Sequence, residues 1–527
     1  MTTLVFVRRF LADYARNRVN LLLLAVVPVV FVVVVAGSMA DAAKLLGGPG
    51  GAAVHTAAAG WAAGFLAGIA MYFQTAATRD TDRRIVIAGL PATRLVAARL
   101  ATGLILALFA SAVALAALAA RTGTDTPARV ITGTMMFAII YLAIGTIVGT
   151  TVANPVNGTV IVLFVWILDV FFGPAMGARD WPATRGMPTH FVTLWMVDLP
   201  SGHPGRLGDL GWALTWTITA VAAAWALAAT RTRTAGKRVH HSRPGGKRVH
   251  HSRPGGIATQ LAAALHAAWR DARRNPTLWV LFVVVPVVFI ITADAVTPNE
   301  PITLTLTEYG RRIAQTLPMP QVHGATMAPI AIGSLAALVG LFTMLDSRDG
   351  DRRAALAGLR PAALLSARLG VLAGAALAAT VVSLAATAAV FDATRWPVYA
   401  AANVLIAFTY ALIGALLAPV FGRVGGVFVA FLLPFLDIGI VQSPMLHPEP
   451  TTWSQLPPGY GGSRILLDGA LTNHFDETRP LLIGAAWLIV LALTVAYAYR
   501  HTTRPARAHH RTATFTRPAT PEPTPAR

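Results

Sequence analysis

One charged segment occurs twice in this chain, and its residues are those best suited to recognising another molecule. Residues 79–84 read RDTDRR, and residues 348–353 read RDGDRR. Each copy follows a long apolar stretch and leads into an Ala-Gly-Leu sequence, at 88–90 and 357–359, with a constant offset of 269. A dense charge cluster between hydrophobic spans must lie in water, and its basic excess favours the cytoplasmic side.

The charges in these segments alternate in sign, which favours docking onto a protein. A loop that only anchors membrane topology needs basic residues but no acidic ones, and such an anchoring loop is the alternative interpretation. The short amphipathic stretches that follow, 85–95 and 354–364, could form helices at the membrane surface. The predicted docking loops contain Arg79, Asp80, Asp82, Arg83, Arg84, Gly89 and Leu90, and Arg348, Asp349, Asp351, Arg352, Arg353, Gly358 and Leu359.

Two carboxylates, Asp169 and Asp437, fall inside apolar runs near one end of their predicted spans. A carboxylate within a membrane is costly and suggests function by default, so a place in a substrate path is one interpretation. The other is a polar cap at the membrane interface, where water is close and the cost is small. Two prolines in other apolar runs, Pro28 and Pro286, are expected to bend their helices.

The motifs of common enzymes do not occur in the sequence. It contains no G-x-x-x-x-G-K-[ST] phosphate loop, no H-E-x-x-H, no G-x-S-x-G and no dinucleotide fingerprint after a strand. Cysteine is absent, which excludes disulfides and thiolate metal sites. We therefore expect a protein that is not an enzyme and that binds no cofactor itself. If ATP drives its work, a separate chain must hydrolyse the ATP.

The composition is that of a membrane protein. Of the 527 residues, 55% are hydrophobic and only 13% are charged, and the mean hydropathy is +0.60. Soluble domains contain about 25% charged residues. The net charge of +20 lies mostly in short segments between apolar runs. That distribution indicates membrane topology and contact with anionic lipids, and not binding of nucleic acid.

The chain contains an internal duplication. The hexapeptide VVPVVF occurs at 26–31 and again at 284–289, an offset of 258. Tyr141 and Tyr410, each followed four residues later by glycine, match at an offset of 269. Ordered matches with few changes of offset indicate a duplicated unit and not chance similarity.

Apolar runs predict an all-α polytopic membrane protein with about twelve transmembrane helices in two homologous six-helix bundles. The expected spans are 19–40, 56–77, 96–120, 130–152, 157–174 and 209–229, and then 277–296, 325–345, 364–391, 398–420, 424–442 and 480–499. Residues 3–18 are too charged to span a bilayer and suit an interfacial helix. The run at 19–40 exceeds the apolar core of a signal peptide, so we expect it to stay in the protein.

The sequence divides into four parts. Residues 1–230 are the first six-span unit with its interfacial helix, 231–256 a basic flexible linker, 257–499 the second unit, and 500–527 a disordered basic tail. The linker repeats the decapeptide GKRVHHSRPG. Its histidines could bind a metal ion, but a linker lying against anionic lipid is the simpler interpretation, so no metal site is expected. Six spans per unit put both termini on the cytoplasmic side of a cell membrane.

An interfacial helix, a first span with the VVPVVF run and a charged segment after the second span together resemble the permeases of ABC-type exporters. In that family the charged segment contains basic and acidic residues, then a glycine, then a Leu-Pro or similar pair before the third span. Residues 82–91 and 351–361 match that order, and the resemblance covers nearly the whole chain. The usual Glu-rich start of the segment is replaced here by Arg-Asp-x-Asp-Arg-Arg.

The resemblance implies an efflux permease that moves its substrate out of the cell. The apolar spans with few charges favour an amphipathic or hydrophobic small molecule, such as a drug, a metabolite or a lipid, as that substrate. A coupling helix in each charged segment would dock on a cytoplasmic ATPase subunit. Two copies of that subunit would use ATP and Mg. One chain with two fused units could then supply the whole membrane part of the transporter.

Two other functions are compatible with parts of the sequence. A proton-driven secondary transporter of the major facilitator type also has twelve spans in two halves, but it turns in a much shorter loop than 78–95. A membrane-embedded transferase would need a convergent set of acids, bases or metal ligands. The loops offer only scattered candidates for that set, namely Asp180, His190, Asp198, His203, His447 and Glu449.

Overall fold

The chain folds into a helical membrane protein. The computed structural model describes residues 2–16, 18–177, 184–199, 205–234 and 256–503. Within these ranges, ten helices are long and apolar enough to cross a membrane. The predicted all-α polytopic membrane protein is therefore confirmed.

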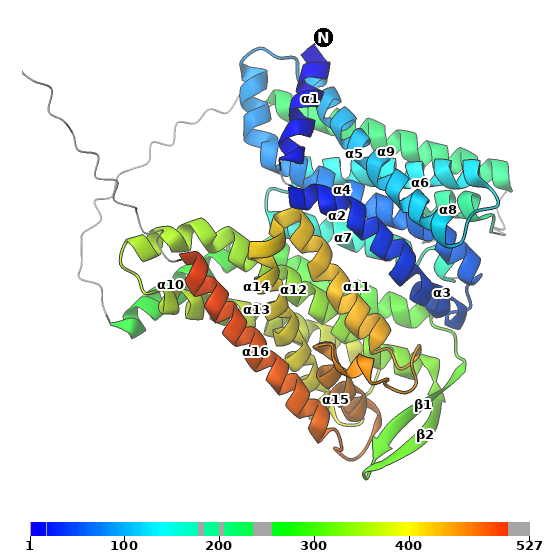
Figure 1. Cartoon of the computed structure of the whole chain (residues 1–527), viewed down its shortest axis with the longest axis vertical. Coiled ribbons are helices and arrows are strands. Elements are labelled where there is room, and N and C mark those ends of the chain that lie inside the picture. Colours follow the sequence, from blue (N-terminus) through cyan, green and yellow to red (C-terminus); the bar gives the residue numbers. More distant parts are fainter. Residues whose placement is uncertain (1, 17, 178–183, 200–204, 235–255, 504–527) are drawn as a thin grey trace, which may run out of the picture.

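The first bundle lies in the upper part of Figure 1 and runs from blue to blue-green. Its helices are α1 (Thr2–Ala15), α2 (Arg18–Val30), the π-helical turn η1 (Phe31–Val35), α3 (Ala36–Leu45), α4 (Gly51–Ile87), α5 (Ala92–Arg121), α6 (Pro127–Thr151), α7 (Pro155–Phe171), the single turns η2 (Pro174–Met176) and η3 (Thr184–Gly186), α8 (His190–Val197) and α9 (Arg206–Thr234).

The second bundle lies below the first and runs from green to red (Figure 1). Its elements are α10 (Ile257–Arg273), α11 (Pro276–Val296), the strands β1 (Pro301–Glu308) and β2 (Arg311–Pro318), α12 (Met319–Leu356), α13 (Pro361–Thr387), α14 (Trp396–Pro434), the π-helical η5 (Phe435–Val441), the single turn η6 (Trp453–Gln455), α15 (Gly459–Leu471) and α16 (Thr478–Thr503).

The described part of the chain has ten long helices where about twelve spans are predicted, because one predicted span is a shorter helix and two others are joined into one segment. Helix α7 is apolar but has only 17 residues. Helix α14 and η5 together form one segment, Trp396–Val441, of 46 residues. At 1.5 Å per residue it would be about 69 Å long, more than twice the hydrocarbon thickness of about 30 Å. The backbone of Gly422 leaves the helical region there, at φ 64° and ψ −157°, so this segment holds two predicted spans joined without a loop.

The charged segments are not loops, and that prediction is wrong. Residues 79–87 are the last turns of α4, and residues 348–356 are the last turns of α12. Neither stretch contains proline, and the single Gly350 weakens a helix by only about 1 kcal/mol. The helices end where Gly89 and Gly358 adopt φ of +102° and +96°, which favours glycine. Of the predicted loop residues, only these glycines and the leucines after them lie in turns.

Helices α4 and α12 are longer than a membrane is thick. They contain 37 and 38 residues and are therefore about 55 Å long. We call the end of each bundle that contains residues 79–90 or 348–359 its charged end, and the opposite end, with α8, α15 and the strands, its loop end. The charged ends lie on the left in Figure 1 and the loop ends on the right.

A close backbone contact holds each bundle together. A Cβ atom on Gly145 of α6 would lie 2.2 Å from the carbonyl oxygen of Gly68 in α4. A Cβ atom on Gly414 of α14 would lie 1.9 Å from the carbonyl oxygen of Ala337 in α12. Small residues allow membrane helices to approach this closely. Both pairs keep the offset of 269, so the contact is a repeated feature of the fold.

The two bundles pack against each other through equivalent helices. Helix α7 of the first bundle contacts α11 of the second, and α2 contacts α14. Asn157 and Asn275 exchange two amide hydrogen bonds across this interface, of 2.7 and 3.1 Å. Phe73 and Phe342, which match at the offset of 269, face each other with ring centroids 6.4 Å apart. A residue that meets its own counterpart indicates approximate two-fold symmetry between the bundles.

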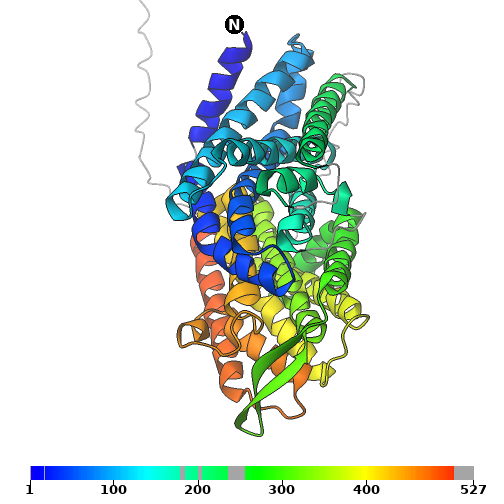
Figure 2. The same ribbon diagram turned by 90° about the vertical axis from the view of Figure 1, so that its right-hand side faces the viewer.

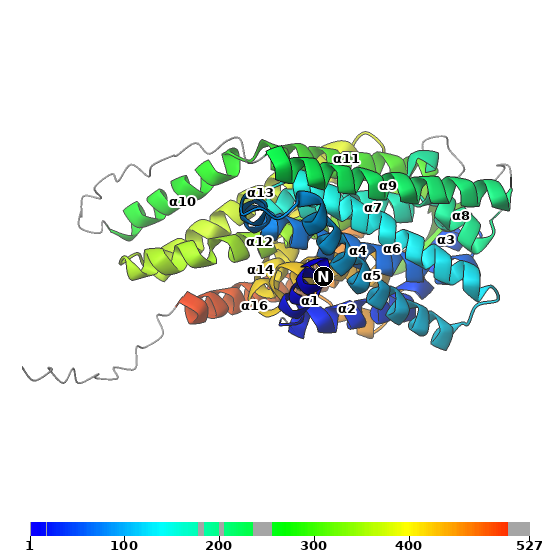
Figure 3. The same ribbon diagram turned by 90° about the horizontal axis from the view of Figure 1, so that it is seen from above.

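The predicted helix before the first span is present, and a second one precedes the other half. Helix α1 packs against α5 through Val7 and Phe10. Helix α10 packs against α13, and the Gln260 side chain accepts a hydrogen bond of 3.1 Å from the Arg360 backbone N–H. Seen from above, α10 lies alongside the charged end of the second bundle (Figure 3).

A β-hairpin at the loop end of the second bundle was not predicted. Strands β1 and β2 pair antiparallel from Pro301–Pro318 to Glu308–Arg311. The alternation of Ile302, Leu304 and Leu306 with threonine is a period-two signal, and Leu304 and Leu306 are buried. The hairpin stands out at the bottom of Figure 2. It lies between the hexapeptide and the charged segment, where the offset between matching residues rises by 269 − 258 = 11.

Two predicted boundaries shift slightly. Helix α9 continues to Thr234 and α16 to Thr503, past the boundaries expected at 230 and 499. The decapeptide repeat with its histidines and the tail 504–527 lie outside the described residues.

Candidate functional site

Each charged end contains an acid–base pair between its second and third long helices. In the first bundle, Arg99 of α5 donates to both carboxylate oxygens of Asp82, at 2.7 and 3.2 Å. In the second, Arg368 of α13 donates to both oxygens of Asp351, at 2.9 and 3.3 Å. Both residues of each pair match at the offset of 269. The two-pronged geometry fixes the projecting end of α4 or α12 against the next helix.

The pairing changes the interpretation of two predicted docking residues. Asp82 is 8% exposed and Asp351 is 1% exposed, so neither carboxylate is accessible to a partner protein. Tyr499 of α16 also donates to Asp351, at 2.9 Å. These aspartates hold the helix ends in place and do not form part of a docking surface.

The remaining residues of the charged segments lie mostly at the surface. Among the residues of the predicted docking loops, the exposed ones are Asp80, Arg84 and Gly89 in the first bundle, and Arg348, Asp349, Arg352, Arg353 and Gly358 in the second. Arg83, Leu90 and Leu359 are partly buried. Next to them, Ile87 is 60% exposed and Leu356 is 67% exposed. These two apolar side chains match at the offset of 269, so each helix end presents exposed arginine together with an exposed aliphatic side chain.

Arg79 has a different role from its neighbours. Its guanidinium donates to the carbonyl oxygens of Gly149 and Val152, with distances of 2.8 and 2.7 Å for the Nε and Nη2 contacts. These carbonyls end α6 and have no partner within their own helix. Arg79 therefore caps α6. In the second bundle a different pair, Asp346 and Arg423 at 2.6 Å, joins the corresponding helices.

Asp169 and Asp437 have equivalent partners in the two bundles. Asp169 accepts hydrogen bonds from the Tyr141 hydroxyl at 2.7 Å and from the Thr189 hydroxyl at 2.6 Å. Asp437 accepts from the Tyr410 hydroxyl at 2.6 Å and from the Gly459 backbone N–H at 2.7 Å. Each carboxylate thus ties a long helix to the start of α8 or α15, and neither lines the cavities described below.

The two prolines sit in different helical surroundings. Pro28 lies inside α2, three residues before the π-helical turn η1 begins at Phe31, whereas Pro286 lies within the continuous helix α11. The Arg121 guanidinium, from the end of α5, donates to the Val32 carbonyl oxygen in η1 at 2.5 Å. A helix that departs from the α form just after Pro28, and that Arg121 contacts there, agrees with the expected bend, while no such departure follows Pro286.

Two neighbouring cavities lie between the bundles, toward the loop end. The larger has a volume of about 100 Å³ and the smaller about 40 Å³. Both are lined by Phe171 of the first bundle and by Phe289, Ile330 and Phe435 of the second. Their linings are largely apolar, and the larger also has four polar lining residues, Ser38, His323, Thr326 and Ser443. The His323 Nδ1 lies 2.5 Å from the Thr297 hydroxyl. A small apolar or amphipathic molecule fits such walls.

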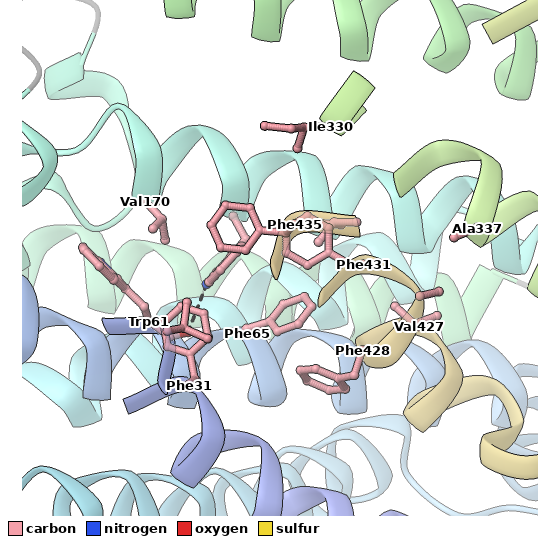
Figure 4. Close-up of a cluster of buried hydrophobic side chains, with 14 of the residues drawn as sticks. Phe31, Trp61, Phe65, Val170, Ile330, Ala337, Val427, Phe428, Phe431 and Phe435 are labelled. Atoms are coloured by element: carbon pink, nitrogen blue, oxygen red, sulfur yellow. Dashed lines mark hydrogen bonds between the residues drawn. The ribbon is translucent and has the colours of Figure 1, made fainter. Parts of the chain in front are cut away.

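A cluster of aromatic rings lies beside these cavities (Figure 4), and two of its members, Phe431 and Phe435, line the smaller one. The ring of Phe65 lies 4.3 Å from Phe428 and 4.8 Å from Trp166, between centroids. Phe431 lies 5.9 Å from Trp166. Edge-to-face contacts at these separations each contribute about 0.5–1.5 kcal/mol beyond burial. The cluster draws on both bundles, so it packs them against each other beside the cavities.

Several residues of these sites were not predicted. Arg99, Arg368 and Tyr499 were not singled out, although the first two recur in an Ala-Arg-Leu match at the offset of 269. Within the described residues, no group of three or more histidine, aspartate or glutamate side chains is placed to hold a metal ion.

Comparison with known proteins gives no assignment. No protein-family model matches the chain, and no curated protein matches it significantly.

Proposed function

We propose that this chain is the permease subunit of an ATP-driven exporter of the ABC type, embedded in the cell membrane with both termini in the cytoplasm. It would carry an amphipathic or hydrophobic small molecule out of the cell. A separate ATPase subunit, in two copies, would bind ATP and Mg and drive the movement. The chain itself would catalyse no reaction.

One observation carries the proposal: the paired projecting ends of α4 and α12. Each helix is about 25 Å longer than the hydrocarbon core is thick, so its end can reach into water. Each end carries exposed arginine and an exposed aliphatic side chain at equivalent positions, Arg84 with Ile87 and Arg353 with Leu356. Exposed apolar side chains rimmed by charge are typical of protein interfaces. Two equivalent surfaces suit two copies of one partner.

The interface between the bundles supports transport by the same chain. The two cavities between the bundles are walled by aliphatic and aromatic side chains from both, and the aromatic cluster packs the bundles together beside them. In this proposal, movement of the helix ends would part the cluster and open a path between the bundles. The closed conformation would be the resting state.

The first prediction concerns the docking surface. We expect Arg84→Glu/Arg353→Glu to weaken binding of the ATPase subunit by about tenfold or more, because reversed charges oppose the partner's complementary surface. Transport would fall with it, while the amount of inserted chain stays unchanged. The measurement is affinity purification from native membranes in mild detergent, with ATPase activity of the recovered complex.

A matched double variant controls for total charge. Arg311→Glu/Arg479→Glu makes the same charge change on two exposed residues at the loop end, and it should leave the complex intact. If no ATP-hydrolysing subunit co-purifies with the wild-type chain and transport follows a proton gradient, the exporter proposal is wrong and a secondary transporter takes its place.

The second prediction concerns the cavities between the bundles. Ile330 lines both, so Ile330→Trp should fill them. A clash of about 1–3 kcal/mol would weaken substrate binding by roughly five- to hundredfold. We expect efflux of a panel of lipophilic dyes from cells to fall accordingly, with partner binding retained. Ile291→Trp, on a side chain 47% exposed on α11, is the matched control. Equal efflux by both variants would contradict a substrate path here.

A further inference from the structure

The charged ends of the two bundles contain equivalent cavities that differ in size. The first cavity lies between α4, α5, α6 and α9 and has a volume of about 210 Å³. The second lies between α12, α14 and α16 and has a volume of about 50 Å³. Arg79 and Asp82 line the first, and their repeat counterparts Arg348 and Asp351 line the second. The cavities therefore occupy the same place in the duplicated fold.

A tyrosine occupies the second cavity. The hydroxyl of Tyr499 donates to Asp351, and its ring lies among the side chains of the lining. The corresponding residue of the first bundle is Thr232, which is much smaller and whose hydroxyl donates to carbonyls of its own helix. The last long helix of each bundle, α9 or α16, contributes three lining residues with the same i, i+3, i+4 spacing. These are Ala228, Arg231 and Thr232 in α9 and, 267 residues later, Val495, Ala498 and Tyr499 in α16.

The walls of the two cavities also differ in polarity. Three hydroxyl groups from α4 and α6 line the first cavity, where the second has apolar side chains. At the offset of 269 the replacements are Thr75 by Met344, Thr146 by Ala415 and Thr150 by Pro419. The Thr75 hydroxyl is buried and makes no hydrogen bond to any described residue. A buried hydroxyl without a partner is unfavourable, so a ligand that accepts its hydrogen bond would stabilise the protein.

The charges of the first cavity favour an anion. Four arginines and two aspartates line it, which gives a formal charge of 4 − 2 = +2. One of these arginines, Arg231, has no ion-pair partner within the described part of the chain, and it is close enough to Arg79 for their charges to repel. The second cavity has one arginine and one aspartate, a formal charge of zero. An excess of positive over negative side chains around one cavity raises the free energy of the empty site.

The remaining walls of the first cavity are apolar. Met71 of α4 and Val96 and Leu100 of α5 line it beside the arginines. Arginine binds phosphate oxygens through two parallel N–H groups, and hydroxyls add further donors. Basic pockets between transmembrane helices are suited to lipid head groups, whose acyl chains can follow the apolar side.

We propose that the cavity of the first bundle binds the phosphate group of an anionic amphiphile. Arg231 and Thr75 are the principal donors, and Arg79 adds positive charge. Tyr499 takes the place of this ligand in the second bundle, so each chain binds one molecule and not two. The site lies apart from the exposed side chains of Arg84 and Ile87 and from the cavities between the bundles, although Asp80 and Arg83 of the charged segment line it. It does not depend on the proposed transport function.

The test measures ligand binding to the purified full chain by native mass spectrometry in detergent. The probe of the lipid arm is phosphatidylglycerol, and the probes of the soluble arm are glycerol phosphate and inorganic phosphate. We expect one phosphatidylglycerol to be retained by the wild type, and Arg231→Ala to weaken its binding about tenfold, a loss of about 1.4 kcal/mol. Thr232→Tyr, which imitates the second bundle, should abolish it.

Arg311→Ala removes a charge at the loop end and should leave binding unchanged. Retention of phosphatidylglycerol that glycerol phosphate does not displace identifies a lipid head group as the ligand. Binding of glycerol phosphate alone, with the same sensitivity to Arg231→Ala, identifies a soluble phosphate compound. The proposal is overturned if no probe binds, or if Arg231→Ala and Arg311→Ala bind the probes equally well. If Thr232→Tyr fails to fold, the comparison of Arg231→Ala with Arg311→Ala still tests the proposal.

Discussion

Gly414→Leu is expected to prevent the second bundle from folding. The Cβ atom alone would lie 1.9 Å from the carbonyl oxygen of Ala337, well inside contact distance, and the obstacle is backbone that no rotamer change can move. Overpacking a core with methylene groups costs about 1–3 kcal/mol, and this clash is more severe. Total stabilities are only about 5–15 kcal/mol. Helices α12 and α14 would have to separate, and the contacts between them would be lost.

The measurement is the yield of monodisperse protein on size-exclusion chromatography after mild detergent extraction. Gly374→Leu makes the same substitution in α13, where a Cβ atom meets nothing within 4 Å, and it should behave like the wild type. Gly145→Leu should fail in the same way as Gly414→Leu, since its Cβ atom would lie 2.2 Å from the Gly68 carbonyl oxygen. Normal recovery of Gly414→Leu would show that these helices pack more loosely than described.

The contrast between the predicted spans and the predicted loops shows what apolar runs can reveal. Hydropathy detects where the chain leaves the hydrocarbon, and helices cover the predicted spans within the described residues. It does not detect where a helix ends, because a helix can continue into water. The sequence therefore predicts loops at residues 79–84 and 348–353, which are helical, and separate surface helices at 85–95 and 354–364, whose first residues instead continue α4 and α12. In the same way, Gly422 turns the backbone without the loop that was expected between two spans.

The candidate site was only partly accessible from the sequence. The duplication identified the equivalent charged segments, because identical residue types recur at one offset. It could not separate their buried from their exposed members, since Asp82 and Arg84 are only two residues apart and differ in the direction of their side chains. The pairing of Asp82 with Arg99 depends on the turn at Gly89, which brings two helices side by side. The cavities depend on packing between helices and leave no local pattern.

The buried charge pair of the second bundle gives the other large effect. Arg368→Met is expected to destabilise the protein by about 3–5 kcal/mol, because it leaves the carboxylate of Asp351 without its counter-ion. The Asp351 side chain is 2% exposed, so water cannot replace the lost partner, and among the described residues Tyr499 is the remaining side chain that donates to it. Thermal unfolding of the purified protein measures the loss, and Arg352→Met, on an exposed neighbour, is the matched control.

The two members of this pair should not be equivalent. The Arg368 side chain is 26% exposed, so in Asp351→Asn its guanidinium can still reach water, and the loss should be smaller than in Arg368→Met. The double variant Arg368→Met/Asp351→Asn should be less destabilised than the sum of the single variants, because no charge is then buried alone. If Asp351→Asn proves the worse single variant, the carboxylate is not the group that depends on its partner. This pair fixes the projecting end of α12 to α13, so Asp351→Asn should also weaken coupling to the proposed ATPase subunit at that helix end. Asp349→Asn changes an exposed carboxylate two residues earlier and should preserve the helix geometry.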